Sequence, residues 1–284
     1  MNQPLVSICI PVYNGEAFIG ETIASALAQT YPNTEIVVSD NASTDRTTDV
    51  VAAAAASDPR IRYERAGSNV GPVGNFNRCL DLARGTYIKI LCADDLLYPD
   101  CLTRQVAVFE DESGRDISLV SAARDIVDER SRVRLRPRQP VPAGRIPATD
   151  AVQRTVRSGT NLYGEPQSVL FRTADARAVG GFNPNYGFCL DLDLWFRLLT
   201  CGDLFRIPDA LCAFRVSPHS WSTGLSGKQA TEFQRFLDDW KTNGPFGLTD
   251  EVIRLGVRRA ALNDRKRRLF YIWLSLTEFL RFGR

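Results

Sequence analysis

The sequence predicts an α/β protein built on a mainly parallel sheet with helices on its faces. Over the first hundred residues, short β-rich runs alternate with segments of helical periodicity, an order typical of parallel strands joined by helical crossovers. The 284 residues allow one sizeable core, and 44% hydrophobic with 24% charged residues is ordinary for a globular protein. The expected strands are residues 5–10, 34–39, 60–64 and 86–92, and the expected helices are residues 16–29, 45–56 and 73–83.

The order of elements changes after residue 100. A segment rich in Arg and Pro, residues 130–147, reads as a hairpin or a long loop. From about Ser226 the pattern is helical, so we expect a first unit of residues 1–225 followed by a C-terminal helical extension of residues 226–284. The elements expected between these segments are strands at 117–122, 167–172 and 211–216 and a helix at 191–200.

Composition argues against several classes of function. A net charge of +2 does not indicate a nucleic-acid binder. Seven scattered cysteines without a C-x-x-C pair, together with a single histidine, argue against a Cys/His zinc site and fit reduced thiols. The N-terminus shows no signal-peptide pattern, and no run reaches the ~20 apolar residues that span a bilayer. We therefore expect the protein to be cytoplasmic.

Acidic residues stand where ligands bind in open α/β sheets, just beyond the carboxyl ends of strands. Asp94 and Asp95 follow the fourth expected strand. Adjacent carboxylates there repel each other and lose solvation unless a cation neutralises them. Mg²⁺ binds through one or two carboxylates plus substrate phosphates. A turn in which an Asp caps the next helix explains the same pair structurally. Asp40 ends the second strand, where an Asp can accept hydrogen bonds from a base edge or a ribose.

Several segments, in this order and spacing, resemble the family 2 glycosyltransferases with the GT-A fold. They include the opening of that family, its strand leading to the D-x-D region, its G-G-F motif and its E-D-x-D-L-W-x-R-L motif. The resemblance covers about residues 4–225. The matching segments are residues 5–47 (LVSICIPVYNGEAFIGETIASALAQTYPNTEIVVSDNASTDRT), 85–99, 180–183 (GGFN), 191–198 (DLDLWFRL) and 207–216.

The resemblance implies a GT-A sheet with a Rossmann-like nucleotide-sugar-binding half, residues 1–100, and an acceptor half, residues 101–225. It implies an inverting, Mg²⁺- or Mn²⁺-dependent glycosyltransferase that uses a nucleotide-sugar donor, with UDP-sugars favoured. The acceptor implied is a hydroxyl of a glycan or lipid-linked saccharide in cell-surface polysaccharide synthesis. Asp95 would ligate the metal, Asp94 would face ribose and metal, and Asp40 would contact the base. The donor-binding residues implied are Pro11, Tyr13, Asn14, Asp40, Asn69 and Asp94.

The general base of the family falls on Asp191, at the start of an expected helix. Asp193 and Arg197 are spaced i,i+4 and are expected to pair, so Asp191 points elsewhere. A structural alternative is that Asp191 caps the helix. The functional interpretation is that Asp191 takes the proton from an acceptor hydroxyl.

Some positions depart from the pattern of the family. Cys92 stands where an Asp is frequent, and Phe76 stands where many relatives carry Arg, which leaves Arg78 as the candidate for a diphosphate contact. Ser217 replaces a His, and His219 nearby is a candidate metal ligand whose alternative is packing or capping. These departures motivate an alternative function, a catalytically inactive nucleotide-sugar binding module.

Two basic segments lie outside these motifs. Arginines alternate from Arg130 to Arg138, which fits either a solvated strand edge or contact with an anionic acceptor. Residues 265–276 (RKRRLFYIWLSL) join a basic cluster to an aromatic-rich run. That segment fits a peripheral membrane anchor, and it fits equally a helix packed on the catalytic domain or on a partner subunit in a dimer.

Overall fold

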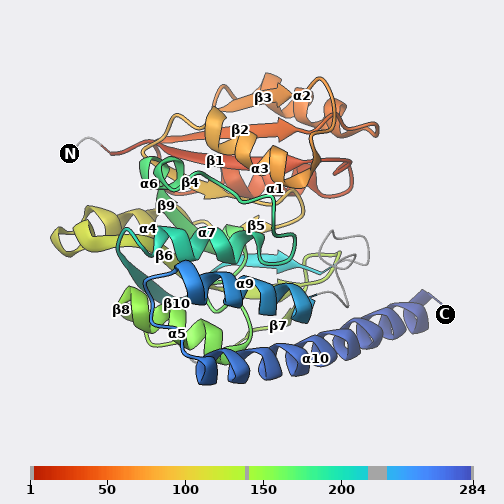
Figure 1. Cartoon of the computed structure of the whole chain (residues 1–284). Coiled ribbons are helices and arrows are strands. Elements are labelled where there is room, and N and C mark those ends of the chain that lie inside the picture. Colours follow the sequence, from red (N-terminus) through yellow and green to blue (C-terminus); the bar gives the residue numbers. More distant parts are fainter. Residues whose placement is uncertain (1–2, 138–140, 217–228, 283–284) are drawn as a thin grey trace.

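One sheet runs through the molecule in a computed structural model that describes residues 3–137, 141–216 and 229–282 (Figure 1). Its strand order is β3-β2-β1-β4-β9-β6-β10-β5. Neighbours β3, β2, β1 and β4 are all parallel, as are β6 and β10, whereas β9 is antiparallel to both β4 and β6. The strands are β1 (Val6–Val12), β2 (Thr34–Asp40), β3 (Ile61–Arg65), β4 (Tyr87–Ile90), β5 (Leu96–Leu97), β6 (Ile117–Val127), β7 (Val133–Leu135), β8 (Gly144–Ile146), β9 (Val169–Arg172) and β10 (Asp203–Arg215).

Helices cover both faces of the sheet and bury it in two apolar clusters. Strand β1 feeds both clusters, because Cys9 points to one face and its neighbours Ile8 and Ile10 point to the other. Helices α1 (Ile19–Leu27), α2 (Thr47–Ser57) and α4 (Cys101–Glu110) cover one face. Helices α3 (Gly71–Leu82), α5 (Ala148–Ser158), α6 (Thr173–Ala178), α7 (Leu190–Leu198) and α9 (Gln229–Asn243) cover the other. The predicted mixed α/β fold with a mainly parallel sheet is confirmed.

After residue 100 several elements differ from the expectation, most clearly strand β10 and helix α5. Strand β10 is longer than the expected residues 211–216, because it passes through register shifts around Pro208 and Asp209 that interrupt its alternating pattern. Helix α5 was not expected. It begins after Pro147 and ends at Gly159, whose φ of 66° is the left-handed conformation typical of a helix end.

The C-terminal helices α9 and α10 share a core with helices α5 and α7. Phe236 of α9 packs against Phe196 of α7 with ring centroids 5.1 Å apart. Helix α10 (Asp250–Phe282) lies so close to α5 that a Cβ on Gly256 would stand 2.3 Å from the Val156 carbonyl oxygen. Helix α10 then continues past the rest of the fold (Figure 1). The expected boundary near Leu225 lies outside the described residues.

Membrane-spanning helices were searched for over the described residues. None of the helices there combines the length and the apolar character needed to cross a bilayer.

Candidate active site

The loops that follow β1 and β2 are joined by hydrogen bonds at the carboxyl edge of the sheet. Val12 lies opposite Asp40 in the parallel register, so both strands end at the same level. The Asn14 backbone N–H donates to Ser43 Oγ at 2.9 Å, and Asn14 Oδ1 accepts from the Thr44 N–H at 2.8 Å. Asn14 has a φ of 52°, a conformation that Asn tolerates better than most residues.

The candidate donor residues of these loops differ in exposure. Pro11 is partly buried within β1, while Tyr13 is 50% exposed. Asn69 is exposed, and its Oδ1 accepts from Asn41 Nδ2 at 2.9 Å and from the Gly71 N–H at 2.8 Å. Asn69 thereby fixes the start of α3, and the expected ligand contact of Tyr13 stays a prediction.

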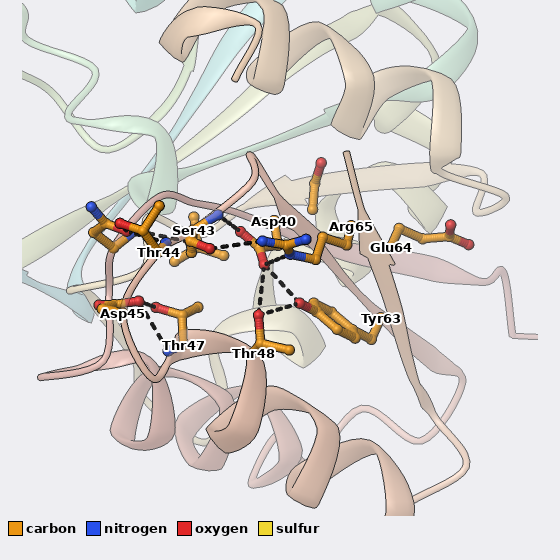
Figure 2. Close-up of polar contacts among 12 residues, drawn as sticks. Asp40, Ser43, Thr44, Asp45, Thr47, Thr48, Tyr63, Glu64 and Arg65 are labelled. Carbon is orange, nitrogen blue, oxygen red and sulfur yellow. Dashed lines mark hydrogen bonds and ion pairs between the residues drawn. The ribbon is translucent and has the colours of Figure 1, made fainter. Parts of the chain in front are cut away.

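Asp40 ends β2 as predicted, but its carboxylate is enclosed (Figure 2). It has no exposed surface, and Oδ2 accepts from the Tyr63 hydroxyl at 2.6 Å and pairs with Arg65 Nε at 3.4 Å. Oδ1 accepts from the Ser43 N–H at 2.8 Å. Burial acts to raise the pKa of Asp40, but these donors outweigh it and lower the pKa below its ordinary value. In this conformation the Asp40 carboxylate is engaged by Ser43, Tyr63 and Arg65, and its expected contact with a nucleobase stays a prediction.

We expect Asp40→Asn to reduce the free energy of unfolding by about 2 kcal/mol at pH 7, because hydrogen bonds to a charged group each contribute about 1.5–3 kcal/mol. The folded pKa of Asp40 is lowered. Its stabilisation is therefore present above the unfolded pKa of about 3.9 and is lost as the pH falls through the folded value. Urea denaturation at pH 7 and near pH 3 measures this difference. Exposed Asp49 on α2 provides the control, and equal effects of Asp40→Asn and Asp49→Asn would contradict the prediction.

Asp94 and Asp95 follow β4, and the structure separates their environments. Asp95 has no exposed surface, and its Oδ1 accepts from the Arg215 backbone N–H at 2.8 Å. Its Oδ2 is buried and has no hydrogen-bond partner among the described residues. Burial, and then the charge of Asp94, raise the pKa of Asp95 well above its ordinary value. Asp94 keeps exposed surface, so it is the carboxylate of the pair that a ligand can reach.

Arg215 holds the loop that carries these two acids. Its fully buried guanidinium donates from Nε to the Asp94 carbonyl oxygen at 2.7 Å and from Nη2 to Glu21 at 2.7 Å. The same group lies 4.6 Å from the centre of the Phe18 ring and donates to the Asp128 carbonyl oxygen at 3.0 Å. Arg215 thus fastens the Asp94 loop to α1 and to the end of β6.

These acids fit a divalent cation that arrives with a diphosphate. Over the described residues, no group of three or more His, Cys, Asp and Glu side chains could hold a metal alone. Mg²⁺ usually retains waters and binds one or two carboxylates plus phosphate oxygens, at about 2.0–2.1 Å. Asp94, which keeps exposed surface, fits the role of metal ligand. The expected metal contact of Asp95, whose buried Oδ2 has no hydrogen-bond partner among the described residues, stays a prediction.

Asp191 lies in the first turn of α7, and its carboxylate faces the loop that contains Asn161. Oδ2 accepts from Asn161 Nδ2 at 3.0 Å, and Oδ1 accepts from the Leu192 N–H at 2.7 Å. Burial, and then the charge of Glu165, raise the pKa of Asp191 to about 7. A carboxylate with that pKa is a competent proton acceptor at neutral pH.

The predicted pair on the same helix is present. Arg197 Nη2 lies 2.6 Å from Asp193 Oδ2, and Trp240 of α9 donates to Asp193 Oδ1 at 3.3 Å. This interaction turns Asp193 away from the carboxylate of Asp191, as the i,i+4 spacing indicates.

Cys92 marks where the acids converge. Burial raises the pKa of its thiol well above the ordinary value, and the charges of Asp95, Asp94, Asp191 and Glu165 raise it further. The charges of four carboxylates from three separate segments therefore all act on one thiol, which places these acids in the same region of the molecule. Asn161, Glu165 and Arg215 are the residues of this region for which we drew no role from the sequence.

Other candidates do not join this group. Arg78 donates to Ser39 Oγ at 2.7 Å and to the Glu64 carbonyl oxygen at 2.8 Å, so it supports β2 and β3. His219 lies outside the described residues. In the arginine-rich segment, Arg134 pairs with Asp128, and Arg136 lies 3.7 Å from Asp125. These pairs favour a solvated strand edge.

Comparisons with known proteins point to one family. Residues 7–172 match the sequence model described as Glycosyl transferase family 2. Chondroitin synthase of Escherichia coli is 29% identical over 262 residues, which make up 90% of this chain and 34% of that protein. S. aureus TarS 1-349 in complex with UDP-GlcNAc has a TM-score of 0.70 at 19% identity, covering 89% of this chain and 72% of that chain. Mannosyltransferase PcManGT of Pyrobaculum calidifontis, in complex with GDP-Man and Mn²⁺, has a TM-score of 0.63 at 17% identity, and the match covers 97% of this chain and 81% of that chain. These two structures match the GT-A type of fold.

Proposed function

The chain belongs to glycosyltransferase family 2, and from this membership we propose that it transfers a sugar, with inversion, from a nucleoside-diphosphate sugar to a saccharide hydroxyl. The observation that carries the proposal is the pairing of two acids in one region, an Asp94 that keeps exposed surface beyond β4 and an Asp191 held by Asn161 at the start of α7. An accessible acid for the metal–diphosphate complex and a raised-pKa acid for the acceptor are then available in one place.

Asp191 acts as the general base. It accepts the proton of the acceptor hydroxyl while that oxygen attacks the anomeric carbon of the donor. The new carbon–oxygen bond forms on the face opposite the bond to the diphosphate, which breaks, so a single displacement inverts the configuration. Asn161 keeps the Asp191 carboxylate in one orientation through its 3.0 Å hydrogen bond.

Asp94 holds the metal side of the donor. A bound Mg²⁺ or Mn²⁺ would neutralise the charge on the departing diphosphate. Arg215 and the buried Asp95 keep the Asp94 loop in place from behind. Mn²⁺ in the structure of PcManGT supports the same use of a metal here.

The site for the nucleotide-sugar donor is formed by Pro11, Tyr13, Asn14 and Asn69. Asp40 fixes the loop and contacts the nucleobase only if Ser43, Tyr63 and Arg65 release its carboxylate. The UDP-GlcNAc complex of TarS supports a UDP-sugar as the donor.

A thermal-shift panel of UDP-, GDP- and dTDP-sugars with and without Mn²⁺ tests this choice. A ligand at about 100 times its Kd stabilises the folded state by about 2.7 kcal/mol, so the UDP-sugar should raise Tm clearly, and more so with Mn²⁺. Absence of a shift with every donor would contradict the proposal. Binding without turnover across an acceptor panel would instead favour the inactive nucleotide-sugar binding module.

The acceptor we propose is a glycan or lipid-linked saccharide in cell-surface polysaccharide synthesis, which the similarity to chondroitin synthase supports. All seven cysteines are free, which supports a cytoplasmic site of action. The first half of α10 packs on α5 and α9, and we propose contact with a membrane surface or a second copy only for its remainder. Liposome flotation of the chain with and without residues 264–284 distinguishes these two partners.

A further inference from the structure

We propose that the loop from Asn161 to Glu165 sets the general base, with Asn161 orienting the Asp191 carboxylate and Glu165, held by Arg124, supplying a fixed negative charge near it. The inference rests on the proposed function of Asp191. The loop lies between α5 and the short turn η2 (Pro166–Ser168), whereas Asp191 belongs to α7. The loop of residues 161–165 and helix α7, which are separate in sequence, therefore meet at Asp191.

A single amide group ties this loop to the base. Asn161 Nδ2 donates to Asp191 Oδ2 at 3.0 Å and to the Gly164 carbonyl oxygen at 2.8 Å, while Asn161 Oδ1 accepts from the Tyr163 N–H at 2.9 Å. Gly164 has a φ of 98°, and a Cβ there would stand 2.5 Å from Ser168 Oγ. The glycine allows the turn that places Glu165 next to the atoms bridged by Asn161.

Arg124 of β6 fixes the direction of the Glu165 side chain. Its Nη2 donates to Glu165 Oε1 at 2.7 Å, and its Nε contacts Oε2, so the pair has the two-point geometry of an arginine–carboxylate fork. The Glu165 side chain is 28% exposed. A fixed negative charge at this position opposes ionisation of a neighbouring carboxyl group.

The other groups around Asp191 leave Glu165 as the charge that acts on it most strongly. After burial, Glu165 is the largest cause of the raised pKa of Asp191, about 7. The thiols of Cys92 and Cys189 also face Asp191, but their own pKa values are raised well above the ordinary value, so both are neutral at pH 7. Asp193 of α7 is committed to Arg197. Asp94 and Asp95 share with Asp191 the surroundings of Cys92.

This arrangement matters because an ordinary Asp, with a pKa of about 3.9, is a weak proton acceptor at neutral pH. General-base efficiency is greatest when the pKa of the base lies near the working pH. Glu165 thus contributes to the rate without touching either substrate, because its charge raises the pKa of Asp191. It is a positioning residue that acts through Asp191.

The test is the pH profile of kcat/KM for the full chain, with the donor that the panel identifies and Mn²⁺. For the wild type we expect the rate to rise with pH through about 7, as Asp191 loses its proton. In Glu165→Gln the midpoint should fall by about half a unit or more, the size of effect that a nearby charge has even in water. Glu165→Asp, which keeps the charge, should restore the midpoint. Asn161→Ala should lower kcat by about 10- to 100-fold with donor affinity unchanged.

Glu64→Gln is the matched control, because Glu64 is also a half-buried glutamate paired with an arginine, 3.2 Å from Arg62 on β3. An unmoved midpoint in Glu165→Gln, or an equal movement in Glu64→Gln, would overturn the inference. Donor affinity and unfolding free energy show whether each variant is folded. If Asp191→Asn is inactive while Glu165→Gln keeps the wild-type midpoint, the loop inference fails alone. If Asp191→Asn retains turnover, the proposed function of Asp191 fails as well.

Discussion

Asp191→Asn should lose about 100- to 10,000-fold in turnover while binding the donor as the wild type does, since this is the usual contribution of a positioned general base. Asparagine preserves the shape of the side chain, and its amide oxygen can still accept from Asn161 Nδ2, which lies 3.0 Å from Asp191 Oδ2. It cannot take a proton from an acceptor hydroxyl. Single-turnover transfer measured with saturating donor separates this chemical loss from binding. Near-normal turnover would remove Asp191 from the mechanism.

The same substitution should not destabilise the fold. The folded pKa of Asp191, about 7, is raised above the unfolded value of about 3.9, so ionising Asp191 costs folding free energy as pH rises between these values. At pH 8 that cost is fully present, and Asp191→Asn removes it. We therefore expect the variant to be at least as stable as the wild type at pH 8 in urea denaturation. Loss of activity together with unchanged or increased stability is typical of a group retained for catalysis.

Asp193→Asn is the matched control on the same helix. Asp193 is buried and accepts two hydrogen bonds from Arg197, so its replacement should lower stability by about 1–3 kcal/mol. Asp191→Asn should therefore lose turnover and keep its stability, whereas Asp193→Asn should lose stability. If Asp193→Asn reproduced the loss of turnover at full stability, the chemistry could not be assigned to Asp191.

The sequence predicted the strands that are buried on both faces and missed the elements that depend on distant partners. β1 and β2 read as continuous apolar runs because helices cover both of their faces. Strand β10 was predicted only in its last part, because Pro208 and Asp209 sit at a bulge whose conformation depends on β6. Helix α5 did carry a local signal that we missed, because its buried residues Ala151, Val152, Thr155 and Val156 recur at helical spacing.

For the candidate site, motif order located Asp94 and Asp191 but gave no measure of accessibility. Asp95 appeared equivalent to Asp94 in sequence, yet the backbone of Arg215, 120 positions away, buries it. Asp40 lies directly opposite Arg65 in the register of β2 and β3, so the alternating charges of the third strand were a signal that could have revealed its ion pair. Glu165 offered no such signal, because it lies near Asp191 only through the fold of its loop. That loop is joined to Asp191 by the side-chain amide of Asn161.

Asp94→Asn should remove the Mn²⁺-dependent part of donor affinity. Asp94 is the acid beyond β4 with exposed surface, and we expect a loss of more than about 100-fold, since even residues that only support metal ligands usually contribute 10- to 100-fold. Calorimetry of UDP-sugar binding with Mn²⁺ and with EDTA measures the effect. The wild type should bind more tightly with Mn²⁺, and the variant should bind equally under both conditions.

Two neighbouring acids make this experiment decisive about which carboxylate meets the metal. Asp100 is exposed and accepts a hydrogen bond from Thr30 Oγ1 at 3.0 Å. The Asp100→Asn variant should therefore bind the donor more tightly with Mn²⁺, as the wild type does. Asp95→Asn separates burial from ligation. If Asp95→Asn loses the Mn²⁺ effect and Asp94→Asn keeps it, the loop must open on donor binding and expose a carboxylate that is now enclosed. If Asp94→Asn alone loses it, the enclosed Asp95 serves the metal only by holding Asp94 and Arg215 in place, because a cation delivered with a diphosphate binds the oxygen that solvent can already reach.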